Sequence, residues 1–236
     1  MPRSESMGSY LDALASAAPT PGGGAAAAWT LAQAAALLCM VCRLTQGKAQ
    51  AARHEDPLRL LLEDALGVKD AAERLADADS LAFQSYGAAA SLPKDTPEAS
   101  EARSRAMQAA LGDAARVPLA VHELASHLLG PRGAVQALAR IGNPRVLSDV
   151  GVARSLALAA RQASAENVQV NLALIKDTAQ AAPLRVRLAQ SEASLEEVGA
   201  PDAAGDALLP DPHARAKVDG ILREIPGRLF PAPRAE

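Results

Sequence analysis

Two aspartates lie two residues apart in the segment 74–86, which reads RLADADSLAFQSY. If this segment is helical, Asp79 shares a face with Leu75 and Phe83, whereas Asp77 shares the opposite face with charged and polar side chains. A carboxylate that faces a core loses hydration, so its pKa rises and it can act as a general acid or base near neutral pH. We therefore predict that Asp79 is catalytic. The alternative is a structural aspartate that caps a neighbouring helix or pairs with an arginine.

Three consecutive glycines, Gly22, Gly23 and Gly24, stand in the segment SAAPTPGGGAAAAW before an alanine run. Backbone N–H groups at the start of a helix, unshielded by side chains, can bind an anion or the edge of a ligand. The segment lacks the Lys-Ser/Thr pair of a P-loop. We predict that these glycines contact substrate. The alternative is a tight loop needed only for close helix packing.

Other polar side chains give weaker indications. Asn167 and Asn171 are four residues apart, so their amides could hold a polar heterocycle or instead bond between helices. Lys48 could bind a ligand carboxylate. Cys39 and Cys42 lie in an apolar helix and the four histidines are scattered, so we expect buried thiols and no metal site.

The elements that must position these residues are predicted to be helices. Hydrophobic residues make up 49% of the chain, aromatic residues only 2%, and strand-like alternation is nearly absent. We predict an all-α bundle of long helices around one central, apolar, alanine-rich helix. Pro118 is expected to kink its helix, and Ser148 is expected to cap the next long one. The expected helices span about 9–17, 24–45, 56–90, 97–129, 135–141, 148–177, 184–198 and 215–224.

Residues 1–198 are predicted to form one helical domain, and residues 199–236 a loosely attached extension rich in proline and glycine. The net charge of −3 gives no indication of nucleic-acid binding. The apolar segment 24–42 could span a membrane by length, but Thr30 and Gln33 interrupt it, so we expect a core helix and no membrane contact. The polar beginning and the two cysteines favour the cytoplasm.

Several segments, in this order along residues 10–177, resemble the formiminotransferase-cyclodeaminase family, whose cyclodeaminase part also includes methenyltetrahydrofolate cyclohydrolases. No segment is specific alone, but together they are. They are PTPGGGAAAA, MVCRLTQGK, DADSLAF, LPKDTPE, VPL, GNPRVLSDVGVA and NVQVNLALIKD. The sequence departs from the family pattern at Ala25, where serine is common, and after Lys48, where more basic residues are usual.

The resemblance implies an all-helical homodimer that acts on the one-carbon unit between N5 and N10 of tetrahydrofolate. The folate is the substrate, and no permanently bound cofactor is expected. The family's active aspartate matches Asp79, with Asp77 as the alternative. Asp149 joins Lys48 and the two asparagines as a weaker binding candidate.

The first activity that we expect is closure of 5-formiminotetrahydrofolate to 5,10-methenyltetrahydrofolate with release of ammonia. One alternative is the methenyltetrahydrofolate cyclohydrolase reaction, which opens the methenyl ring with water. The expected lack of a formiminotransferase domain in this chain favours that alternative. A second alternative is a non-catalytic helical dimer that binds folate or a protein.

Overall fold

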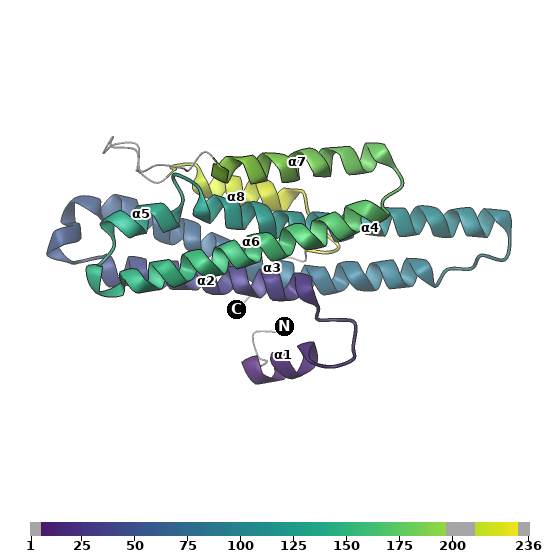
Figure 1. Cartoon of the computed structure of the whole chain (residues 1–236), viewed down its shortest axis with the longest axis horizontal. Coiled ribbons are helices and arrows are strands. Elements are labelled where there is room, and N and C mark those ends of the chain that lie inside the picture. The colour runs from purple at the N-terminus through teal and green to yellow at the C-terminus, as the bar shows by residue number, and fades with distance from the viewer. Residues whose placement is uncertain (1–5, 197–210, 231–236) are drawn as a thin grey trace.

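The computed structural model describes residues 6–196 and 211–230, and all regular structure in these two ranges is helical (Figure 1). The predicted all-α bundle is therefore confirmed. Its elements are α1 (Met7–Leu14), α2 (Gly23–Thr45), η1 (Ala49–His54), α3 (Glu55–Ala90), α4 (Pro97–Leu129), α5 (Ala134–Ile141), η2 (Pro144–Val146), α6 (Leu147–Leu174), α7 (Thr178–Glu196) and α8 (Ala214–Arg223).

Helix α2 occupies the centre of the bundle and packs against α3 and α6. Its alanines allow neighbouring helices to approach closely, and Leu31, Leu38 and Val41 between them are fully buried. By length and composition this helix could cross a membrane, and among the described residues no other helix passes that test. Most of its apolar window is buried inside the protein, as expected for a core helix.

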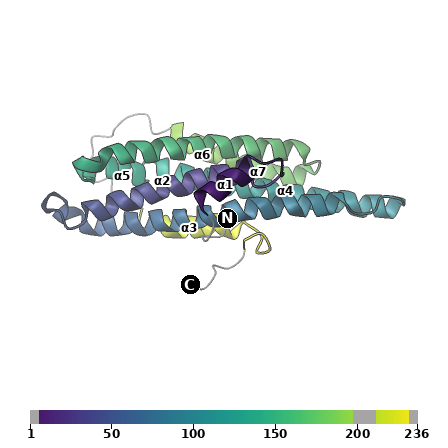
Figure 2. The same ribbon diagram turned by 90° about the horizontal axis from the view of Figure 1, so that it is seen from below.

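Helix α2 runs antiparallel to both α3 and α6. The α3 residue Asp79 lies beside Ala25 at the start of α2, and Asn143, just before α6, hydrogen-bonds Thr45 at the end of α2. Helices α3 and α4 extend together beyond the rest of the bundle in two perpendicular views (Figure 2). Each long helix therefore brings residues far apart in sequence to the same level of the bundle.

Helix α1 is an arm outside the bundle, next to the start of α2 (Figure 1, Figure 2). Ser6 caps it by accepting a hydrogen bond from the Ser9 N–H. Tyr10 is the one buried residue of α1, at 7% exposure, whereas Met7 and Leu11 are more than half exposed. The arm is thus held to the bundle mainly through one aromatic side chain.

Local signals placed most helix ends correctly. Thr96 caps α4 as the Thr-Pro pair predicts, with its hydroxyl accepting from the Ala99 N–H. The prediction for Ser148 is wrong, because α6 begins one residue earlier and no side chain caps it. Instead Asn143 caps the short η2 turn that leads into α6. Pro118 lies inside the continuous helix α4.

The expectation of a loosely attached C-terminal extension is wrong for residues 211–230. Helix α8 packs against α3 and α4, and Val218, Ile225 and Leu229 are buried in the main core. The Arg74 guanidinium lies 3.6 Å from the centre of the Phe230 ring. The predicted boundary at residues 198–199 lies outside the described ranges and stays a prediction, as does dimerisation.

Cys39 and Cys42 are buried in α2, as expected. Loss of hydration raises the pKa of the Cys39 thiol to about 11 and that of Cys42 to about 12. Both therefore remain neutral thiols near pH 7 and act as small core side chains.

Candidate active site

Asp79 contacts the backbone at the start of α2. Its Oδ2 accepts a hydrogen bond of 3.0 Å from the Ala25 N–H, which is in the first turn of that helix. A Cβ atom on Gly24 would lie 2.0 Å from Asp79 Oδ1 and 2.5 Å from its Cγ. Gly24 therefore lacks a side chain because the Asp79 carboxylate occupies that space. The sequence suggests that the glycines leave room for a ligand, but at Gly24 contact with Asp79 is the direct reason for a glycine.

The structural alternative for Asp79 is realised in part, because one carboxylate oxygen caps α2. The other oxygen, Oδ1, forms no hydrogen bond with the residues that the structure describes, and no basic side chain among them pairs with Asp79. Burial raises the pKa of the Asp79 carboxyl, and the Ala25 N–H offsets part of that rise. The site thus holds a partly buried carboxylate with one oxygen fixed and one oxygen available for proton transfer.

Tyr10 of α1 and Trp29 of α2 form an aromatic pair near the start of α2. Their ring centroids are 6.1 Å apart with a tilt of 59°, and Trp29 is one helical turn after Ala25. Burial and the nearby charge of Asp79 raise the pKa of the Tyr10 hydroxyl. The sequence alone predicts no role for either side chain, although aromatic residues make up only 2% of the chain and their rarity is a usable signal.

The two predicted asparagines occupy the same end of the bundle. The Asn167 amide is 3.8 Å from the position of a Cβ on Gly23, so it stands beside the glycine segment. Asn171 Nδ2 donates to the Ala114 carbonyl at 2.9 Å and so ties α6 to α4. The Asn171 amide N–H is therefore used in a bond between helices, as the alternative predicts. Asn167 instead lies beside the glycines at the start of α2.

Lys48 and Asp149 are not brought to Asp79 within this chain. Lys48 follows the end of α2 and Asp149 lies in the first turn of α6, at the opposite end of the bundle. A helix rises 1.5 Å per residue, so this end is ~30 Å from Ala25. Asp77 is exposed on α3, as predicted. The positions of Lys48, Asp149 and Asp77 therefore give no support to their predicted roles in binding or proton transfer.

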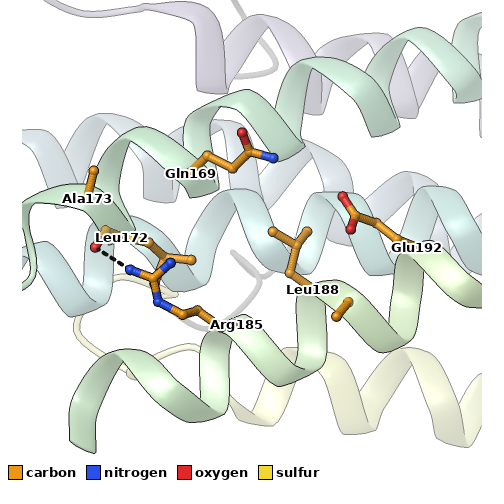
Figure 3. A pocket seen from close by; sticks show the side chains of 7 residues that line it. Gln169, Leu172, Ala173, Arg185, Leu188 and Glu192 are labelled. Atoms are coloured by element: carbon orange, nitrogen blue, oxygen red, sulfur yellow. Dashed lines mark hydrogen bonds between the residues drawn. The ribbon is translucent and has the colours of Figure 1, made fainter. Parts of the chain in front are cut away.

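Two cavities lie on other parts of the described surface. The first, of about 430 Å³, is between α6 and α7, where Arg185 donates to the Leu172 carbonyl (Figure 3). The second, of about 870 Å³, is beside α4, α7 and α8. Its charged lining includes Arg187, which is paired with Glu123, and His127, which is paired with Asp64. These two basic side chains are therefore already paired within the protein.

Fold and site together define a helical bundle with a partly buried aspartate at the glycine-rich start of its central helix. The sequence model of the formiminotransferase-cyclodeaminase family matches residues 6–190. The chain belongs to this family, which confirms the resemblance seen in the sequence. It is an enzyme of the cyclodeaminase and cyclohydrolase group in folate one-carbon metabolism.

Three relatives illustrate the range of the family. A methenyltetrahydrofolate cyclohydrolase of Methylorubrum extorquens is 39% identical over 85% of this chain and 93% of its own length. A formimidoyltransferase-cyclodeaminase of Sus scrofa is 35% identical over 76% of this chain, which spans only 32% of that protein. The solved formiminotetrahydrofolate cyclodeaminase of Thermotoga maritima has a TM-score of 0.73 at 26% identity and covers 94% of this chain and 98% of its own.

Proposed function

We propose that this chain is a methenyltetrahydrofolate cyclohydrolase that uses Asp79 as its general base. The observation that carries the proposal is the Asp79 carboxylate, fixed through Oδ2 by the Ala25 N–H and partly buried against Gly24. The M. extorquens relative supports this substrate, because the match extends over almost the whole of both chains.

The substrate would bind with its methenyl carbon near Asp79 Oδ1. The bridging N–C–N unit is a cation, so the negative charge of Asp79 attracts it. Because Oδ2 is already held by the backbone, the position of Oδ1 is fixed by the junction of two helices. Asn167, beside Gly23, can offer an amide donor and acceptor to the planar heterocycle.

Hydrolysis then needs two proton movements. Asp79 takes a proton from water as the oxygen bonds to the methenyl carbon, and the C=N electron pair returns to nitrogen. The hydroxyl proton of the resulting adduct next passes by way of Asp79 to one bridge nitrogen. That C–N bond breaks, the nitrogen keeps the electron pair, and a formyl group forms on the other nitrogen. One water is consumed and one proton is released overall.

The test compares two neighbouring aspartates on α3. Purified wild-type protein, Asp79→Asn and Asp77→Asn are each mixed with 5,10-methenyltetrahydrofolate, and the loss of methenyl absorbance is followed. We expect Asp79→Asn to lower kcat about 100-fold or more. Asp77→Asn, which alters an exposed carboxylate, should stay within about twofold of wild type. Wild-type decay no faster than the enzyme-free rate would refute the proposal.

Closure of 5-formiminotetrahydrofolate with loss of ammonia is the second candidate. The T. maritima structure and the Sus scrofa relative favour it, since both carry the cyclodeaminase name. The same carboxylate could take the proton from the attacking nitrogen and transfer it to the departing ammonia. In a parallel assay with 5-formiminotetrahydrofolate, rising methenyl absorbance that depends on Asp79 would favour this reaction over hydrolysis.

A further inference from the structure

Two buried polar groups near the start of α2 have no hydrogen-bond partner among the described residues. They are the Tyr10 hydroxyl and the Trp29 indole N–H. Tyr10 is more than nine-tenths buried and the two rings pack against each other. A buried donor without a partner destabilises the folded state, so folded proteins rarely retain one without a role. Here two such donors occur in one aromatic pair.

The position of this pair ties it to the reaction site. Trp29 lies one turn after Ala25, whose N–H holds Asp79, and the charge of Asp79 contributes to the raised pKa of Tyr10. Tyr10 reaches this place from α1, where it is the sole buried side chain. A phenylalanine at position 10 would be sufficient to pack α1 against the bundle. The Tyr10 hydroxyl therefore needs a separate explanation.

We propose that Tyr10 and Trp29 are substrate-contacting residues whose O–H and N–H donate hydrogen bonds to the oxygen atom that adds to the methenyl carbon. This inference rests on the proposed function. Asp79 accepts a proton from the attacking water, and the two donors bind the oxygen of the adduct as it forms. Negative charge on that oxygen increases as the proton leaves, and fixed donors stabilise such charge most strongly in a partly desolvated site.

The main test is Tyr10→Phe, which removes the hydroxyl and retains the ring against Trp29. We expect kcat for 5,10-methenyltetrahydrofolate to fall about 10- to 100-fold with a smaller change in KM, because the lost bond is strongest in the transition state. Trp29→Phe should lower kcat in the same direction. Tyr86→Phe is the matched control, since Tyr86 is the only other tyrosine and packs against a different cluster.

A binding measurement separates this inference from the proposed function. Trp29 is the only tryptophan, so its fluorescence reports on this pair directly, and tetrahydrofolate serves as the probe. We expect its emission to change on binding in wild type and in Asp79→Asn. Helix content and the unfolding midpoint of Tyr10→Phe should match those of wild type, so that a fall in kcat reflects the hydroxyl.

The possible outcomes distinguish the role of the Tyr10–Trp29 pair from the proposed function. Normal wild-type turnover with kcat unchanged in Tyr10→Phe, or lowered equally in Tyr86→Phe, overturns the role of the pair while the proposed function stands. A wild-type protein without turnover, whose Trp29 emission nevertheless responds to tetrahydrofolate, overturns the proposed function and retains the pair as a folate contact. Trp29 emission that is indifferent to tetrahydrofolate overturns the contact itself.

Discussion

At the scale of single residues, the two oxygens of Asp79 differ: Oδ2 is bound to the backbone, and under the proposed function Oδ1 transfers the proton. Oδ2 caps α2 through the Ala25 N–H, and this bond favours the charged form. Burial acts in the opposite direction and is the larger effect, so the pKa of Asp79 is above its ordinary value of 3.8. A carboxylate with a raised pKa binds a proton more strongly than an exposed carboxylate does.

This raised pKa predicts an acid limb in the pH profile of the enzyme. Asp79 must be ionised to accept a proton, so kcat/KM should fall as the pH decreases through its pKa, starting above the range of an ordinary aspartate. Measuring kcat/KM from neutral to acidic pH checks this. Asp77→Asn should keep the limb, and the residual rate of Asp79→Asn should lack it. An unchanged limb in Asp79→Asn would assign the base to another group.

At the scale of elements, the site is the contact between the start of α2 and the middle of α3. It depends on Gly24, since any side chain there would meet the Asp79 carboxylate. The N–H groups in the first turn of a helix have no partner within that helix, and the glycine-rich start of α2 lets a carboxylate of α3 reach one of them.

We therefore expect Gly24→Ala to inactivate the enzyme. The new methyl carbon would stand 2.0 Å from Asp79 Oδ1 and force the carboxylate away, and displacement of a catalytic group by about 1 Å can cost about 100-fold in rate. Gly87→Ala is the control on α3, because a Cβ there meets nothing within 4 Å. It should keep full activity and gain about 0.5–1 kcal/mol in the free energy of unfolding. Full activity in Gly24→Ala would contradict this geometry.

The same contact shows what sequence could and could not predict. Helical periodicity placed Asp79 on the inner face of α3, and Pro and cap residues fixed most helix ends. The partner of Asp79 could not be derived, because pairing residues 54 positions apart requires the tertiary arrangement. The same limit applies to Tyr10, whose burial comes from Trp29 on another helix, and to Lys48, which is adjacent to α2 in sequence yet far from the site.

At the scale of the whole molecule, the core does not end with the six helices from α2 to α7. The segment 211–230 crosses α3 and α4, and its buried aliphatic side chains join the main core. Arg228 forms an ion pair with the buried Asp113 of α4, which Arg116 also contacts. The sequence predicts the short helix of this segment but not its docking, for which a few aliphatic residues are enough.

This docking predicts that the C-terminal segment contributes to global stability. Val218 on α8 is fully buried, so Val218→Ala removes two methyl groups from the core and should lower the free energy of unfolding by about 2 kcal/mol. Val186 on α7 is 53% exposed, and Val186→Ala should change it by less than about 0.5 kcal/mol. Urea unfolding followed by helical circular dichroism measures both. If both variants unfold at the same urea concentration as wild type, α8 is not part of the cooperative core. A lower midpoint for Val218→Ala alone means that this segment unfolds together with the helices that hold Asp79.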